Sequence, residues 1–528
     1  MTKGTTVTPT GASLIAGRSV VGTAGSTRAH NPATGEALGP EFGYAGPEDL
    51  AAATRAATEA FEPYRATSPS ERAAFLDLIA DNLDAARDAI VARAVLESGL
   101  TEARLFGEHA RTVNQLRLFA REVRLGEHHG VRIDEAQPDR QPIPAPDIRQ
   151  RQISIGPVLV FGASNFPLAF STAGGDTASA LAAGCPVIVK AHNSHAGTAE
   201  LAGRAISDAV AQSGLPAGVF SIIFGAGSAV GQALAQDPAI KAIAFTGSQA
   251  AGTALMATAA ARPEPIPVYA EMSSINPVIL LPGAVAECAE ALATGFVGSL
   301  TLGAGQFCTN PGLIFVPAGQ ARFVEAVGEL LRESVGQTML SANIAAAYTE
   351  GLERLADAGV TQVATGAEGA TLNAPAPALF TTTAAHFRDS PDMQEEVFGA
   401  AALVVTYDDQ AELRETLREM QGQLTATIHA AIGDQALAAD LLPVLETMAG
   451  RILFNGWPTG VEVTHAMVHG GPFPATSNAM TTSVGTLAIQ RFLRPVSYQN
   501  LPASLLPEPL RVDNPWHLPR RLNGMPQT

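Results

Sequence analysis

Three side chains that lie far apart in the sequence have the chemistry for covalent catalysis at a carbonyl group. Cys308 lies in GAGQFCTNPG, a glycine-bracketed turn that would leave its thiol accessible. Glu271 closes the run PVYAE, and a carboxylate there could deprotonate a thiol or a water. Asn165, in FGASNFPLAF, could hold an oxyanion together with the backbone N–H of Cys308. The three residues predict nucleophilic chemistry at Cys308.

Each of these residues also has an ordinary structural interpretation. A free cysteine is often a small buried hydrophobe, and a glutamate is usually exposed or paired. An asparagine at such a turn can cap the helix that follows it. The functional interpretation therefore depends on all three residues occurring together.

Lys190 is the best candidate for holding a cofactor. It ends the run CPVIVK and is one of only three lysines in the chain. Ligands of a doubly wound sheet bind beyond the carboxyl ends of its strands, so a cation there would meet a ribose hydroxyl or a phosphate. The glycines of FGAGSAVG and FTGSQAAG could admit a dinucleotide phosphate, although their spacing is not the dinucleotide fingerprint and they could simply form turns.

The elements that must position these residues are helices and buried parallel strands. Apolar residues recur at helical spacing over 47–127, and a Pro-rich segment at 135–149 interrupts them. From 156 to 271 the pattern alternates strand and helix, which predicts a doubly wound α/β sheet. A second α/β region follows Ser273, and 481–498 is predicted to be extended.

Composition narrows the class of protein. A chain of 528 residues with 46% hydrophobic and 16% charged residues is expected to fold into two large domains. The formal net charge of -17 disfavours nucleic acid or a membrane as partner. Three scattered cysteines predict no disulfide framework and no metal site. With no leader or long apolar segment apparent, we expect a cytoplasmic protein acting on a small molecule.

The order of these motifs along the chain resembles the aldehyde dehydrogenase superfamily. The resemblance covers nearly the whole chain, and the joint occurrence of the motifs is far more specific than any one of them. It rests on Asn165 after a strand, Lys190, Phe245-Thr246-Gly247-Ser248, Glu271, Gly305-Gln306-Phe307-Cys308 and Glu395-Glu396-Val397-Phe398-Gly399.

This resemblance implies two doubly wound α/β domains and a small β oligomerisation arm, in a homodimer or homotetramer whose arm segments pair across subunits. The implied division is a cofactor-binding domain at 1–134 and 156–272, an arm at 135–155, a catalytic domain at 273–480, and a C-terminal arm and tail at 481–528.

Within the superfamily, strings such as RPEPIPVYAEMSSINPV and HGGPFPATS are similar to the 2-oxoglutarate semialdehyde (2,5-dioxopentanoate) dehydrogenases. The implied reaction is NAD(P)-dependent oxidation of that aldehyde to 2-oxoglutarate. The main alternative is an NADP-dependent fatty or other aliphatic aldehyde dehydrogenase. An inactive binding protein or an acyl transferase to coenzyme A is less favoured, because Cys308, Glu271, Asn165 and Lys190 are all present.

The resemblance also assigns roles. The Cys308 thiolate would attack the aldehyde, Asn165 would stabilise the oxyanion, and Glu271 would activate water to hydrolyse the thioester after hydride transfer to nicotinamide. Glu396 would hold the nicotinamide ribose, and Phe398 would lie against the ring. The remaining implied cofactor contacts are Ser164, Lys190, Asn193, Gly231, Thr246, Gly247 and Ser248.

Two departures from the superfamily pattern bear on this assignment. NAD-specific members commonly carry an acidic residue where this chain has Asn193, and a carboxylate there would repel a 2′-phosphate. We therefore expect a preference for NADP, with NAD possible. Ser273 and Ser274 replace two familiar glycines after Glu271, which leaves the geometry of that turn open.

A dicarbonyl acid would also need a cation for its distal carboxylate, since the acidic chain gives no long-range attraction. Arg111 is the candidate, because the equivalent family helix lines the substrate tunnel. An exposed helix arginine is an equally ordinary interpretation. Arg117 and Arg491 are the alternatives.

Overall fold

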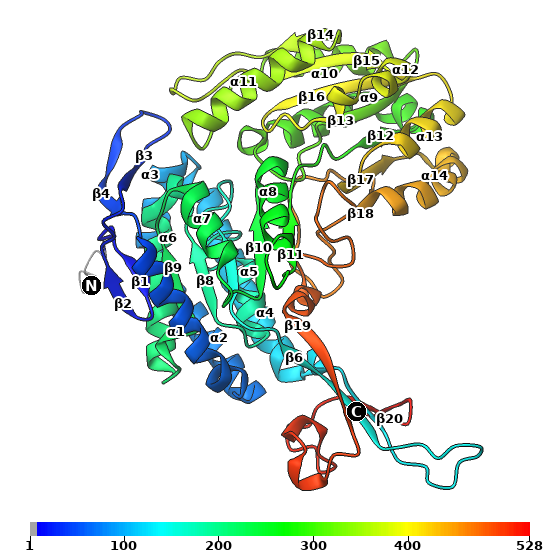
Figure 1. Ribbon diagram of the computed structural model, residues 1–528. Coiled ribbons are helices and arrows are strands. Elements are labelled where there is room, and N and C mark those ends of the chain that lie inside the picture. The colour runs from blue at the N-terminus through cyan, green and yellow to red at the C-terminus, as the bar shows by residue number, and fades with distance from the viewer. Residues whose placement is uncertain (1–7, 528) are drawn as a thin grey trace.

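The computed structural model describes residues 8–527, and it contains two large sheets of seven strands each and a smaller sheet of five (Figure 1). The first large sheet has the order β11-β10-β7-β8-β9-β1-β2. Its parallel strands are β7 (Val158–Phe161), β8 (Val187–Lys190), β9 (Phe220–Ile223), β10 (Ala242–Thr246) and β11 (Val268–Glu271). The hairpin β1 (Ser13–Ile15) and β2 (Arg18–Val20) extends its edge in antiparallel register.

Helices cover both faces of this sheet because its strands are apolar on both faces. Val158 and Val160 of β7 pack with one set of helices, whereas Leu159 and Phe161 pack with the other. The first set is α2 (Pro69–Ala85), α4 (Glu102–Leu125), α5 (Gly175–Ala182) and α6 (Ala196–Gln212). The second set is α1 (Pro47–Arg65), α7 (Gly227–Gln236) and α8 (Gln249–Ala260). The predicted doubly wound sheet is confirmed.

The helical region predicted from 47 to 127 consists of four helices: α1, α2, α3 (Arg87–Ser98) and α4. Local residues set their ends. Ser68 and Glu71 form a capping box at the start of α2, and the Thr101 hydroxyl accepts a bond from Arg104 N at the start of α4. Gly99 and Gly126 end α3 and α4 in the left-handed conformation.

The second large sheet repeats the same architecture in the order β14-β15-β16-β13-β12-β17-β18. Its strands are parallel except for β14, which is antiparallel to β15. The strands are β12 (Val278–Leu280), β13 (Leu313–Pro317), β14 (Thr361–Thr365), β15 (Ala378–Thr383), β16 (Ala401–Tyr407), β17 (Gln423–His429) and β18 (Ala449–Phe454).

Helices cover both faces of this second sheet as well. One face carries α9 (Pro282–Thr301) and α10 (Ala321–Arg332), and the other carries α12 (Ala384–Asp389), α13 (Gln410–Glu419) and α14 (Gln435–Met448). The segment Pro282–Gly305 is long and apolar enough to meet a length and hydropathy criterion for a membrane span. In the fold, Phe296 and Leu300 of this segment are fully buried in the core with β12 and β13, and core helices meet the same criterion.

The five-stranded sheet projects away from both domains as an arm (Figure 1). It contains β5 (Val131–Asp134), β6 (Ile148–Ser154), β19 (Leu493–Gln499), β20 (Arg520–Leu522) and β21 (Met525–Gln527). β6 and β19 pair with each other within one chain, in antiparallel register. Pairing of the arm across subunits stays a prediction.

The prediction that 481–498 is extended throughout is wrong for its middle. Thr486–Phe492 forms a 3-10 helix, η7, and only the residues from Leu493 onward form β19. Tertiary packing decides this, because Ile489 and Phe492 are buried in the core of the first domain. η7 thereby anchors the arm to that domain.

We expect Phe492→Ala to lower the free energy of unfolding by about 3–5 kcal/mol, because the fully buried ring leaves a cavity behind. Denaturant unfolding followed by circular dichroism measures the effect. Leu487→Ala is the matched control, since Leu487 lies in the same η7 but is 56% exposed. Equal losses for the two variants would contradict the anchoring role of Phe492.

Candidate active site

A cavity of about 390 Å³ lies between the carboxyl ends of strands of the first sheet and the loops that precede β13 and β16 of the second sheet. It brings together nine residues singled out from the sequence: Ser164, Asn165, Thr246, Gly247, Ser248, Glu271, Cys308, Glu396 and Phe398. These residues come from five separate segments of the chain. Their convergence agrees with the rule that ligands of open α/β sheets bind beyond the carboxyl ends of the strands.

The loop that carries Cys308 depends on left-handed backbone conformations. Gly303, Ala304 and Gly305 have φ values of 57°, 60° and 70°. A Cβ on Gly305 would lie 2.3 Å from the carbonyl carbon of Gly399, so only glycine allows this loop to approach the Glu396–Gly399 turn so closely. The next residues then place Cys308 in the wall of the cavity with its side chain partly exposed.

Asn276 connects the Cys308 loop to the segment that follows Glu271. Its side-chain Nδ2 donates to the carbonyl oxygens of Cys308 and Asn310, each at 2.9 Å. Its own backbone N–H donates to Gln423 Oε1 on β17 at 3.0 Å. Asn276 is fully buried and has a φ of 51°, a conformation that asparagine adopts more readily than most residues.

The two serines that depart from the family pattern have partners. Ser274 Oγ accepts a bond from Leu424 N at 2.9 Å and lies 2.9 Å from Gln423 Oε1, so it joins the same buried network. Ser273 lines the same cavity as Glu396; burial raises the pKa of the Glu396 carboxyl, and the Ser273 side chain acts to lower it. The departure therefore adds polar contacts to the turn after Glu271.

Asn165 lies beside the Cys308 loop and is not a helix cap. Its Nδ2 donates to Gln306 O at 3.3 Å, and its own carbonyl oxygen accepts from Arg104 Nη2 at 3.0 Å. The following helix, α5, begins only at Gly175 with Gly174 as its cap. An amide has two hydrogens on Nδ2, so the second can point at an oxyanion formed near Cys308.

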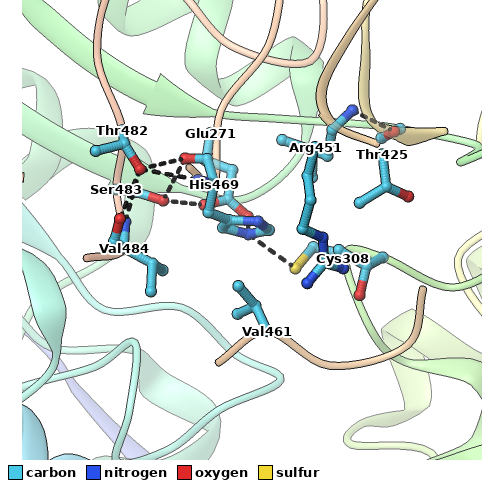
Figure 2. A network of polar contacts seen from close by, with 12 residues as sticks. Glu271, Cys308, Thr425, Arg451, Val461, His469, Thr482, Ser483 and Val484 are labelled. Carbon is cyan, nitrogen blue, oxygen red and sulfur yellow. Dashed lines mark hydrogen bonds and ion pairs between the residues drawn. The ribbon is translucent and has the colours of Figure 1, made fainter. Parts of the chain in front are cut away.

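His469 lies between Glu271 and Cys308, as Figure 2 shows. Its Nε2 is 2.8 Å from Glu271 Oε1 and 3.4 Å from Cys308 Sγ. The second oxygen of Glu271 accepts a bond from Ser483 Oγ at 2.7 Å. Both Glu271 and His469 are buried, so this chain of contacts is shielded from water.

The electrostatics of this group keep the thiol protonated and the carboxylate charged at rest. Burial, and then the Glu271 carboxylate, raises the pKa of Cys308 well above its ordinary value. Burial alone would raise the pKa of Glu271, but His469 and the hydrogen bonds from His469 and Ser483 hold it below its ordinary value. The thiol therefore needs a base to become a nucleophile. The Glu271 carboxylate lies within 4.8 Å of Cys308 Sγ, and His469 Nε2 donates to that carboxylate and holds it in place.

Sequence reasoning missed His469. The histidine stands in HGGPFPATS, a string used only for its resemblance to a subgroup. Nothing local in the sequence indicates that it meets residues 161 and 198 positions away.

On the cofactor side, Lys190 and Asn193 lie at the end of β8. Lys190 is buried, and burial lowers its pKa to about 8. Asn193 lines a second cavity of about 430 Å³, and its Oδ1 is buried without a hydrogen-bond partner among residues 8–527. An orphaned polar atom beside a cavity fits a site that a polar ligand completes.

The structure also bears on two further residues predicted to contact the cofactor, Glu396 and Gly231. Burial raises the pKa of Glu396 to about 8, so its carboxyl can titrate near neutral pH. Gly231 lies in α7, where a Cβ would be 2.9 Å from the ring of Phe161. Helix packing alone accounts for that glycine, and its cofactor contact stays a prediction.

The structure distinguishes the three candidate arginines. Arg111 lies on α4 with Nη1 buried and unpartnered among the described residues, and its guanidinium is 5.0 Å from the ring of Phe170. Arg117 is paired with Asp81 and Asp84 near the surface. Arg491 is buried against Asp176 at 2.8 Å. Of the three, Arg111 is the one with a buried donor that has no partner among the described residues.

Comparison with known proteins agrees with this geometry. The family model described as aldehyde dehydrogenase family matches residues 21–472. The chain is 53% identical to alpha-ketoglutaric semialdehyde dehydrogenase 2 of Azospirillum brasilense, over 98% of this chain and 99% of that protein. It is 46% identical to alpha-ketoglutaric semialdehyde dehydrogenase of Acinetobacter baylyi, over 98% of each.

Among solved structures, 1-pyrroline-5-carboxylate dehydrogenase from Thermus with bound NAD has a TM-score of 0.79 at 22% identity, with 92% of each chain covered. That likeness shows the fold. The chain belongs to the aldehyde dehydrogenase family.

We expect His469→Gln to lower kcat/KM for an aldehyde at pH 7 by about 10–100-fold, because Glu271 loses the contact that keeps its pKa low and its carboxylate oriented. In the wild type, kcat/KM should rise with pH as the high-pKa thiol deprotonates, and the variant should need a still higher pH. A pH–rate profile measures both effects.

His465→Gln is the control for this experiment, because His465 belongs to the same segment but its side chain is 63% exposed. It should keep the wild-type profile. A His469→Gln enzyme with an unchanged profile would show that His469 does not hold the pKa of Glu271 down.

Proposed function

We propose that this aldehyde dehydrogenase oxidises 2-oxoglutarate semialdehyde to 2-oxoglutarate through a covalent intermediate on Cys308. The observation that carries the proposal is the meeting of Cys308, Glu271 and Asn165 in one cavity, with His469 in contact with both Cys308 and Glu271. Two relatives named for this substrate, similar over nearly their whole length, support the choice of aldehyde.

The first half of the reaction uses Glu271 and Asn165. The Glu271 carboxylate, which His469 Nε2 holds in place by donating a hydrogen bond, takes the thiol proton, and Cys308 Sγ attacks the aldehyde carbon to form a thiohemiacetal. The free Nδ2 hydrogen of Asn165 and a backbone N–H stabilise the resulting oxyanion. When bound, the nicotinamide cofactor supplies the hydride acceptor for the oxidation.

The second half uses Glu271 again. The acyl group remains on Cys308 as a thioester, and the Glu271 carboxylate takes a proton from a water that attacks it. Glu271 has by then passed the thiol proton to solvent, and it gives the proton taken from water to Sγ as the sulfur leaves and the acid product is released. Because Glu271 has a lowered pKa, it is charged and ready to act as the base at neutral pH.

We further propose that the residues fit an NADP cofactor, with NAD as a weaker alternative. Lys190 would hold the ribose or its phosphate, and Asn193 carries no charge to repel a 2′-phosphate. Glu396 and Phe398 would contact the nicotinamide ribose and ring. Lys190 is the cation at the carboxyl end of a parallel strand, where a cofactor is expected.

The substrate side depends on Arg111. Its unused donors can pair with the distal carboxylate of a semialdehyde acid, and bidentate pairing with a carboxylate is a strong form of recognition. The ring of Phe170 is 5.0 Å from the Arg111 guanidinium and 6.2 Å from the ring of His469, and these contacts support the proposed role of Arg111 near the reaction centre.

Steady-state rates with 2-oxoglutarate semialdehyde, succinic semialdehyde and a long-chain aldehyde test this proposal. The wild type should have its highest kcat/KM for 2-oxoglutarate semialdehyde, and Cys308→Ala should be inactive with all three. Arg111→Met should raise KM for the acids at least tenfold, since a charged hydrogen-bonded pair is lost, and leave the long-chain aldehyde unaffected.

Arg117→Met, on the same helix but in surface ion pairs, is the matched control and should behave as wild type. A wild-type preference for the long-chain aldehyde would reject the substrate assignment. Turnover by Cys308→Ala would reject the covalent mechanism.

Cofactor affinity should depend on pH through Lys190. Its pKa of about 8 means that the cation is present below this pH and is lost as the pH rises through it. KM for NADP should therefore rise between pH 7 and pH 9, more steeply than KM for NAD. Lys190→Met should raise KM for NADP and remove its pH dependence.

Lys241→Met is the control, because Lys241 lies at the surface in an ion pair with Glu264. In a separate variant, Asn193→Glu should raise KM for NADP at least tenfold and lower or maintain that for NAD. Equal effects of Asn193→Glu on the two cofactors would contradict the proposed basis of NADP preference.

We also propose that the enzyme is a cytoplasmic homodimer or homotetramer assembled through the arm. The arm exposes apolar side chains, among them Ile143 at 68% and Met525 at 69%. Exposed apolar residues on a projecting sheet are typical of a surface that another subunit covers.

A further inference from the structure

Glu271, Cys308 and His469 together offer a set of ligands that a transition metal prefers. Their ligand atoms, one carboxylate oxygen, one sulfur and one imidazole nitrogen, all lie within 4.8 Å of one another. Zinc sites use these three ligand types, and sites with three protein ligands keep a fourth position open. The positions of these residues along the chain do not indicate a metal site, because the three come from distant segments with no metal-binding spacing.

The distances are close to those of a tetrahedral site. Zn–S and Zn–N bonds of about 2.3 Å and 2.0–2.1 Å place sulfur and nitrogen about 3.5 Å apart at a tetrahedral angle. Cys308 Sγ and His469 Nε2 are 3.4 Å apart. His469 Nε2 and Glu271 Oε1, at 2.8 Å, would need to separate by about half an ångström to reach the corresponding nitrogen–oxygen distance.

We propose that Zn²⁺ binds reversibly to Cys308 Sγ, His469 Nε2 and Glu271 Oε1 and thereby inhibits the enzyme. On binding, the Cys308 thiol loses its proton to solvent and His469 carries its ring proton on Nδ1, so that the sulfur, Nε2 and the carboxylate oxygen donate to the metal without any change of oxidation state. The metal then blocks the nucleophile and the proton acceptor Glu271 at once. The inhibition rests on the proposed function, whereas the binding rests on the geometry alone.

The surroundings of the three ligands favour a reversible site over a permanent one. Ser483 Oγ donates to Glu271 Oε2 and so orients the carboxylate, as outer partners of metal ligands do. A histidine that binds a metal tightly usually donates from its other ring nitrogen to a hydrogen-bond partner. His469 Nδ1 is buried and has no such partner in the part of the chain that the structure describes, so the site lacks this support. Cysteine and histidine ligands also select against Mg²⁺ and Ca²⁺, which prefer oxygen.

Titration of the full-length, metal-free protein with Co²⁺ in the absence of aldehyde and cofactor tests the site. A thiolate-to-cobalt charge-transfer band should grow to one equivalent in the wild type, and Zn²⁺ should abolish it by displacement. Cys308→Ser should remove the band. His469→Gln and Glu271→Gln should each weaken Co²⁺ binding at least tenfold, with folding checked by circular dichroism.

Cys288→Ser is the matched control, because Cys288 is the exposed free cysteine on α9. It should bind Co²⁺ as the wild type does and should be inhibited by the Zn²⁺ concentration that displaces Co²⁺. A band lost in Cys288→Ser, a band kept in Cys308→Ser, or no binding at millimolar Co²⁺ would overturn the proposal. None of these results would affect the test of aldehyde oxidation, which uses metal-free enzyme and a chelator.

Discussion

The buried side chain of Asn276 is the contact on which the geometry of the site depends most. The bonds that it donates to two carbonyl oxygens of the Cys308 loop, and the bond from its backbone N–H to β17, link the nucleophile, the turn after Glu271 and the second sheet. A buried amide that lost these partners would leave several polar groups unsatisfied. Because all its partners are present, the loop and the turn hold one fixed relation.

These contacts bring together two groups whose pKa values are shifted in opposite directions. Burial favours the neutral thiol of Cys308, whereas hydrogen bonds favour the charged carboxylate of Glu271. His469 lies between them with one nitrogen that can face either group. The same arrangement that lets a proton move between these groups also gathers ligands for a soft metal, so catalysis and the proposed inhibition share one physical origin.

The two domains contribute different residues to the site, because these residues lie at strand ends of the first domain and in loops of the second. The first domain supplies Asn165, Lys190 and Glu271 from the carboxyl ends of its parallel strands or the turns after them. The second supplies Cys308 and Glu396 from loops that a glycine contact at Gly305 holds together. Because each domain contributes only part of the set, the site exists only where the two domains meet.

The sequence by itself determined the doubly wound sheets, through apolar strands such as VIVK and AIAF, and it indicated Cys308, Glu271, Asn165 and Lys190 through their neighbours. These features follow from local patterns, since strand burial and turn chemistry are written in adjacent residues. Three features became visible only in the folded protein. η7 interrupts the extended C-terminal segment, and His469 contacts Cys308. Arg111, rather than Arg117 or Arg491, has free donors. Each of these depends on contacts between segments more than 100 residues apart or on competing ion pairs, and no local pattern encodes which distant partner a side chain will meet.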